Sequence, residues 1–239
     1  MNKKNQAIMV CLICLILMCI GACSKKDAEM SQQKNPKTFT FFDIDANTRL
    51  TERIKWKLKN KLGSDVLERG TLADMTTNYK GFLQNYFPKL YELSRELRYD
   101  DVMDTEDNPV KLTYRHTQNK NTPFAYVEIV FSGHTKKPLF FRIKTKKQRS
   151  DVIDVLRKKY GDPAVTDWNE NVAYGKKGRS LHWNKDNDIL IVSIVPDRFG
   201  DPEYYIMIYY VNNLEENAGI NKERRERKQK ENKTIDNAF

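Results

Sequence analysis

The sequence is poor in the residues that most enzymes use for metal binding and nucleophilic catalysis. It has three histidines and four cysteines among 239 residues. No two histidines have the i, i+4 spacing of a helical zinc motif, and no Gly-x-Ser-x-Gly turn is present to display a nucleophilic serine. We therefore expect no metal, no cofactor and no catalytic residue of a recognisable class.

The three histidines are isolated from one another along the chain. His116, His134 and His182 each fall in a different expected strand or turn. Ser132 precedes His134 by two residues, but the serine and the base of a catalytic triad usually come from distant segments. We interpret this stretch as a turn between strands, and the histidines as polar strand positions.

Long apolar runs are absent beyond the first residues. Residues 7–20 form one uncharged apolar stretch of 14 residues. As a helix it would cover about 21 Å, whereas the hydrocarbon core of a bilayer is about 30 Å thick. The stretch follows Lys3 and Lys4, and this order of basic, apolar and small residues is typical of a secretory signal. Residues 1–22 are therefore predicted to be a signal peptide.

The end of this segment reads Ile20-Gly21-Ala22-Cys23 and resembles the lipobox of bacterial lipoproteins. The resemblance implies cleavage before Cys23, a diacylglycerol thioether on its sulfur and a palmitate-type acyl group on the new amino group. One acyl chain holds a protein to a bilayer only marginally, so two or three chains imply lasting attachment. Ser24 follows the cysteine where many Gram-negative lipoproteins of the inner membrane have Asp. This implies the outer membrane, facing the periplasm, with the plasma membrane as the alternative.

Cysteine is scarce after the predicted cleavage point. Cys11, Cys14 and Cys19 lie in the predicted signal peptide, so only Cys23 remains. No intramolecular disulfide is then available, and the exported domain must rely on its hydrophobic core. Twelve tyrosines, eleven phenylalanines and three tryptophans supply apolar volume for that core.

The chain is basic, with 42 Lys and Arg against 32 Asp and Glu and a net charge of +10. Such a surplus favours anionic partners. Export past the cytoplasmic membrane argues against nucleic acid, so we expect a membrane or another envelope component as the partner.

The first half of the exported chain has helical periodicity. Residues 23–38 are polar and predict a flexible tether, and residues 39–44 are the first segment able to form a short strand. Apolar residues then recur every four positions over residues 50–62, and Gly63 provides a helix stop. Residues 75–98 predict a second helical region with a break at Pro88.

From residue 110 the apolar period changes to two, which predicts about six strands and one intervening helix, over residues 150–160. The expected strands are residues 110–116, 124–132, 138–144, 179–183, 189–195 and 203–211. Helices followed by an antiparallel sheet indicate an α+β domain over residues 39–214. Residues 215–239 predict a charged tail, either a solvated helix or disordered. Residues 148–211 are also similar to the helix-on-antiparallel-sheet modules of many envelope lipoproteins, a family pattern that supplies no catalytic residues.

The strongest functional signal beyond Cys23 is a basic segment without acidic residues. It comprises Lys136, Lys137, Arg142, Lys144, Lys146, Lys147 and Arg149. Strand alternation places Arg142, Lys144 and Lys146 on one face, and together with the basic helix at residues 49–61 they predict a cationic surface. Anionic lipid headgroups, lipopolysaccharide phosphates or an acidic protein fit such a surface, and a basic face that serves solubility is the alternative.

These observations predict a membrane-anchored envelope lipoprotein whose domain is a non-catalytic binding or assembly module. The alternative is a hydrolase of cell-wall or lipid substrates that uses carboxylates not identifiable from sequence. Two carboxylates about 5–9.5 Å apart in a deep pocket would favour the hydrolase. A purely structural role at the membrane is a third option.

Overall fold

The computed structural model describes residues 37–64, 66–70, 74–98, 108–115, 122–146, 151–169 and 177–236. The predicted signal peptide, Cys23, Lys147, Arg149 and the Ser150 end of the predicted helix lie outside these residues. The described part contains five helices and eight strands, in the order α2 (Glu52–Leu62), β1 (Val66–Gly70), α3 (Phe82–Tyr86), α4 (Pro88–Arg98), β2 (Val110–Arg115), β3 (Phe124–Phe131), β4 (Pro138–Thr145), α5 (Asp151–Tyr160), β5 (Ala164–Asn169), β6 (Lys177–Lys185), β7 (Asp188–Pro196), β8 (Pro202–Tyr209) and α6 (Val211–Asp236).

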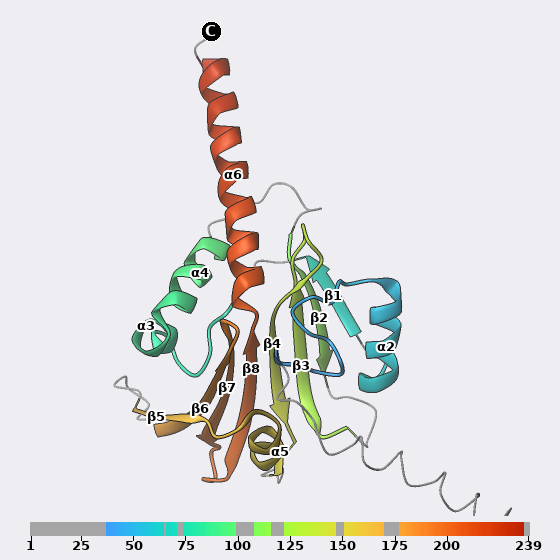
Figure 1. Cartoon of the computed structure of the whole chain (residues 1–239), viewed down its shortest axis with the longest axis vertical. Coiled ribbons are helices and arrows are strands. Elements are labelled where there is room, and N and C mark those ends of the chain that lie inside the picture. Colours follow the sequence, from blue (N-terminus) through green and yellow to red (C-terminus); the bar gives the residue numbers. More distant parts are fainter. Residues whose placement is uncertain are drawn as a thin grey trace, which may run out of the picture. The chain divides into compact units, whose positions relative to one another are not determined.

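All eight strands pair antiparallel in one sheet with the order β1-β2-β3-β4-β8-β7-β6-β5. The predicted α+β class is therefore confirmed, but the prediction of about six strands is wrong, because β1 and β5 were missed. Both are short strands at the two edges of the sheet (Figure 1). The sequence of β1 has no apolar alternation and all its residues are exposed, so no periodic signal marks it.

The strand order shows an internal repeat that the sequence does not display. A helix followed by a four-stranded meander occurs twice, as α2-β1-β2-β3-β4 and as α5-β5-β6-β7-β8. The two meanders meet through β4 and β8, where Phe141 is opposite Ile208. The hairpin α3–α4 is inserted between β1 and β2 of the first unit. In both units the first helix ends at a glycine, Gly63 or Gly161, with positive φ, whose N–H bonds the carbonyl four residues earlier.

One face of the sheet packs against α2 and α5, and we call it the α2–α5 face. Leu58 and Leu62 of α2 and Tyr160 of α5 belong to one buried cluster with alternate residues of the central strands, such as Phe141 and Val192. The segment 39–46 lies in the same cluster, so its aromatic side chains enter the core as expected. It does not form a sheet strand, because positive φ angles at Phe42 and Asp43 turn the chain back on itself.

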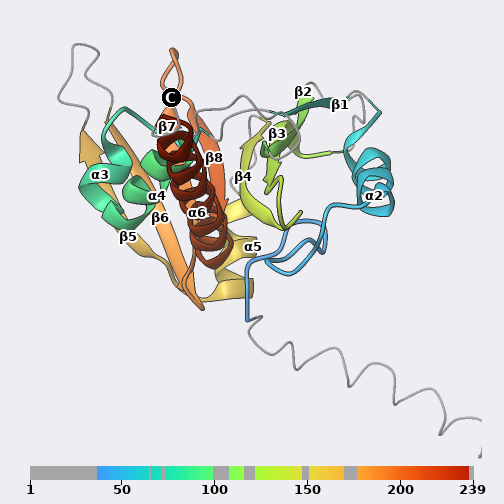
Figure 2. The ribbon, with the colours of Figure 1, turned by 90° about the horizontal axis from the view of Figure 1, so that it is seen from above.

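The opposite face, the α4–α6 face, packs against α3, α4 and α6. Its buried cluster combines Leu90 and Leu93 of α4 and Leu214 of α6 with sheet residues such as Phe140 and Met207. Figure 2 shows α3 and α4 on one side of β6–β8 and α5 on the other. The predicted break at Pro88 is confirmed, since α3 ends at Tyr86 and α4 begins at Pro88.

Helix α6 runs without interruption through residue 214, the predicted end of the domain. Its first turns contribute Val211 and Leu214 to the core, and its C-terminal turns extend beyond the ends of the strands (Figure 1). Asn213, Asn217 and Asn221 recur every four residues and are buried. This buried stripe is polar, so apolar periodicity could not reveal it. Among the described residues, no helix has both the length and the apolar composition needed to cross a bilayer.

Asp188, the first residue of β7, is a titratable group that bonds the N-terminus of α6. The Asp188 carboxylate is buried and accepts the Val211 N–H at 3.1 Å. Burial is the main cause that raises the pKa of Asp188 to about 7, partly opposed by this hydrogen bond. The folded protein therefore holds a proton that the unfolded chain, with an Asp pKa of about 3.9, has already released. This stabilisation is present below about pH 4 and is lost as the pH rises to about 7.

We expect Asp188→Asn to remove this dependence while retaining the oxygen acceptor for Val211. Relative to the wild type, the free energy of unfolding of D188N should rise by up to about 4 kcal/mol between pH 4 and pH 7.5. That value is an upper limit, because a helix N-terminus favours a carboxylate. Urea unfolding across this pH range is the measurement, and parallel pH profiles for the two proteins would contradict the prediction.

Candidate functional site

A charge-paired group of side chains projects from the α4–α6 face where β3, β4 and β8 lie side by side. We call it the β4 network, and it consists of Tyr126, Glu128, Arg142, Lys144, Glu203 and Tyr205. Arg142 and Lys144 alternate along β4 with Phe141 and Ile143, which are buried on the α2–α5 face. The sheet register places Glu128 opposite Arg142 on one side and Tyr205 opposite Lys144 on the other.

The β3 side of the network centres on a nearly buried carboxylate. Glu128 is 5% exposed and forms an ion pair with Arg142, with Nη1 and Oε1 2.9 Å apart. Its other oxygen accepts the Tyr126 hydroxyl at 2.6 Å. A buried carboxylate is costly unless it is paired and hydrogen-bonded, so Tyr126 and Arg142 are what permit Glu128 at this position.

The β8 side repeats the same chemistry with a lysine. Lys144 Nζ lies 2.9 Å from Glu203 Oε1, and the Tyr205 hydroxyl donates to Glu203 Oε2 at 2.7 Å. The Lys144 ammonium also lies 5.1 Å from the centre of the Tyr205 ring, within the range of a cation–π contact. Arg142 and Lys144 are therefore each paired with a glutamate from a neighbouring strand, and each glutamate also accepts a tyrosine hydroxyl from its own strand.

Arg142 also attaches the segment at residues 74–78 to the sheet. Its Nη2 donates to the carbonyl oxygens of Asp74 and Thr76 at 2.8 and 3.0 Å. Between this segment and the sheet lies a hollow of about 290 Å³, which we call the β4–β8 hollow. Its lining comprises Thr76, Thr77, Asn78, Arg142, Trp168, Val195, Tyr205 and Met207. Aromatic and aliphatic walls with a few polar groups are typical of binding sites.

The titratable groups of the network favour binding over acid–base catalysis. Burial, with a hydrogen bond to Glu128, raises the pKa of Tyr126 to about 12. Burial lowers the pKa of the Lys144 ammonium, but hydrogen bonding and charge interactions with Glu203 and Tyr205 together outweigh it, and the net pKa is raised. Burial raises the pKa of Glu203, but its bonds from Lys144 and Tyr205 outweigh that and lower it. These three groups therefore keep one protonation state near neutral pH, whereas general acid–base catalysis needs a pKa close to the working pH.

Neither of the two hollows beside the β4 network is lined by two carboxylates. Glu203 is the one acidic residue that lines the hollow at Lys144, Thr145 and Lys146, and the β4–β8 hollow has no acidic lining residue. No group of three or more His, Cys, Asp or Glu side chains suited to a metal ion occurs within the described ranges. These two hollows therefore do not supply the pair of carboxylates that the hydrolase alternative needs.

The predicted basic residues are only partly brought together. Arg142 and Lys144 share a face, but the carboxylates of Glu128 and Glu203 match their charges. Lys137 forms an ion pair with Glu216 of α6 at 2.9 Å, and Lys136 is exposed in the β3–β4 turn. Helix α2 packs on the α2–α5 face, so the sheet lies between it and the β4 network.

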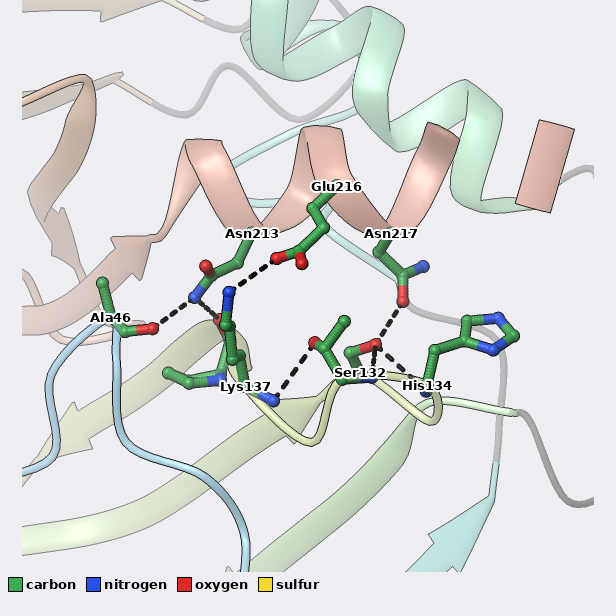
Figure 3. A network of polar contacts seen from close by, with 9 residues as sticks. Ala46, Ser132, His134, Lys137, Asn213, Glu216 and Asn217 are labelled. Atoms are coloured by element: carbon green, nitrogen blue, oxygen red, sulfur yellow. Dashed lines mark hydrogen bonds and ion pairs between the residues drawn. The ribbon is translucent and has the colours of Figure 1, made fainter. Parts of the chain in front are cut away.

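The Ser132–His134 pair takes part in a structural contact between the β3–β4 turn and α6 (Figure 3). Ser132 Oγ donates to Asn217 Oδ1 at 2.6 Å and accepts the backbone N–H groups of His134 and Thr135. His134 Nε2 lies 2.8 Å from Asn221 Oδ1. These contacts fit our interpretation of a turn between strands. His182 lies in β6 and His116 falls outside the described residues.

The acidic and aromatic members of the network are the part that the sequence did not indicate. Tyr126-x-Glu128 and Glu203-x-Tyr205 each place two polar side chains on one face of an otherwise apolar strand. This alternation could have indicated a polar group on one face of each strand. The convergence of the two pairs on β4 could not be predicted, because Glu203 is far from Lys144 in the sequence and only the β4–β8 pairing brings them together.

The burial of Glu128 predicts a strong dependence on Arg142. Replacing Arg142 with Met leaves the carboxylate without its cation, and we expect the free energy of unfolding to fall by about 3 kcal/mol. The double variant R142M/E128Q should lose less than the sum of R142M and E128Q, by about 1–2 kcal/mol. Lys146→Met, at the end of the same strand, is the control and should change stability by under about 0.5 kcal/mol. Additive single and double variants in urea unfolding would refute the coupling.

Comparison of the chain with protein-family models, with curated proteins and with solved structures found no match.

Proposed function

We propose that the protein is a cell-envelope lipoprotein, anchored through lipid on Cys23, whose domain is a non-catalytic binding or assembly module. The anchor is inferred from the sequence Ile20-Gly21-Ala22-Cys23, which lies outside the described residues. Ser24 supports the outer membrane, facing the periplasm, as the location, and the plasma membrane is the alternative. The domain would meet its partner while held at this surface.

The observation that carries the binding role is the β4–β8 hollow beside the β4 network. Tyrosine, tryptophan, methionine and arginine are enriched in protein interfaces, and Tyr205, Trp168, Met207 and Arg142 line this hollow. The hydrogen bonds and ion pairs of the network fix Tyr205 and Arg142 in place, so little side-chain entropy is lost on binding.

The charge pairing favours an envelope protein over anionic lipid as the partner at this face. Arg142 and Lys144 are each matched by a glutamate, so the network offers alternating charges and not a uniform positive field. Alternating charges recognise a complementary arrangement on another protein and set its orientation. Anionic lipid needs only a uniform positive field.

Photo-crosslinking in intact cells tests both parts of the proposal. A photoreactive phenylalanine analogue would replace Val195, a half-buried residue that lines the β4–β8 hollow. We expect a discrete crosslinked species from the full-length chain carrying Cys23, and incorporation of a palmitate analogue into the same chain. Cys23→Ser should abolish the lipid label and reduce crosslinking, because the domain no longer remains at the membrane.

The matched control is Val165 of β5, which is also a strand valine but is 54% exposed and aligned with Leu181 of the α2–α5 face. The same analogue at Val165 should give no discrete species. Equal crosslinking from both positions would contradict a specific role for the hollow. A lipid label that persists in Cys23→Ser would contradict the anchor separately.

A further inference from the structure

Helix α2 presents an exposed tryptophan in the middle of a basic surface. Trp56 is 64% exposed, whereas the other two tryptophans, Trp168 and Trp183, are buried. Residues three and four positions away share a helix face, so Arg53, Lys59, Glu52 and Asn60 flank Trp56, and all four are exposed. The one acid among them, Glu52, is paired with Lys55. Ile54, Leu58 and Leu62 form the inward side of α2 and pack in the sheet core, and Trp56 does not belong to that cluster.

The internal repeat shows that the fold itself does not require this surface. When the stop glycines Gly63 and Gly161 are aligned, Leu58 and Leu62 of α2 correspond to Leu156 and Tyr160 of α5, which pack on the same face. Trp56 then corresponds to Asp154, which is exposed. Helix α5 covers its half of the sheet with an acidic residue at the position where α2 has tryptophan.

The charges of α2 are also only partly matched within the domain. Lys55 pairs with Glu52 and Glu68, and Lys57 pairs with Asp43. Arg53, Lys59 and Lys61 form no ion pair with any described residue. The outer side of the helix therefore combines a tryptophan ring with an unmatched positive charge.

These two properties fit the surface of a bilayer that contains anionic lipid. Tryptophan prefers the headgroup region, where one part of the ring is apolar and its N–H is hydrated. Each nearby cation raises the affinity for an anionic surface by about fivefold. We infer that α2 docks on the anionic phospholipid surface through Trp56, Arg53 and Lys59, as a second membrane contact beside the lipid on Cys23.

The inference rests on the proposed anchor, which makes a weak contact effective. Lys37, the first described residue, is the fourteenth residue after Cys23, so the connecting chain reaches at most about 50 Å. Confinement this close to the bilayer gives a high effective concentration, and a patch of one aromatic ring and two cations is then sufficient.

Tryptophan fluorescence of the full-length lipidated protein in vesicles tests the inference. The vesicles contain phosphatidylglycerol and phosphatidylethanolamine, with bromine on the acyl chains as the quencher. The emission that is lost in Trp56→Phe is assigned to Trp56, since the buried Trp168 and Trp183 remain in that variant. We expect brominated lipid to reduce the Trp56 emission about twofold in anionic vesicles. When phosphatidylcholine replaces the anionic lipid, the Trp56 emission should not be quenched. The double variant R53E/K59E should remove the quenching on anionic vesicles.

The repeat supplies the matched control. In the Trp56→Phe background, Asp154→Trp places an exposed tryptophan at the equivalent position of α5, and its emission should stay unquenched. Equal quenching at both positions would show only that the domain lies near the bilayer, and it would overturn the inference. The inference would also be overturned if the protein floats with the vesicles but the Trp56 emission is not quenched. Wild-type protein that carries no lipid and does not float would instead contradict the proposed anchor.

Discussion

The pairing of β4 with β8 is the interaction on which the rest of the structure depends. It joins two meanders that are each formed by local hairpins into one eight-stranded sheet. Both strands bury apolar side chains on both faces: Phe141 and Ile208 contribute to one core and Phe140 and Met207 to the other. Strands covered on both sides are held by more apolar burial than edge strands. The same pairing brings Lys144 beside Glu203 and so forms half of the β4 network.

Sequence periodicity predicted those elements whose burial leaves a regular apolar pattern. Helix α2 with its Gly63 stop, the break at Pro88 and the central strands β3, β4, β7 and β8 belong to this group. The edge strands leave no periodic apolar pattern: all residues of β1 are exposed, and β5 contributes Trp168 to the core without an apolar alternation along the strand. Apolar periodicity does not continue through α6 because its buried stripe consists of asparagines. Asn217 and Asn221 bond Ser132 and His134 of the β3–β4 turn, and Asn213 bonds the Pro138 carbonyl at the start of β4; Figure 3 shows the contacts of Asn213 and Asn217. The shared face of Arg142 and Lys144 followed from alternation, but their glutamate partners depend on register between distant strands.

The duplicated plan also separates what the fold requires from what is added to it. Both units need an inward helix stripe and a glycine at the helix end, and both have them. The first unit alone has the inserted α3–α4 hairpin, which covers the α4–α6 face, and the exposed Trp56 on α2. The segment that leads into the hairpin is held by Arg142 and forms a wall of the β4–β8 hollow. The segment that walls the hollow and the exposed Trp56 therefore belong to what distinguishes the two units, whereas the rest of the hollow is formed where the two units join.

The central claim is that the β4–β8 hollow is occupied by a partner at the membrane. Its most direct test is covalent side-chain labelling of the full-length protein, compared in native membranes and after purification, with labelled residues quantified by mass spectrometry. We expect Tyr205, which lines the hollow, to be labelled less in native membranes than in the purified protein, while the exposed Lys158 of α5 is labelled equally in both. Equal labelling of Tyr205 in the two states would contradict this claim.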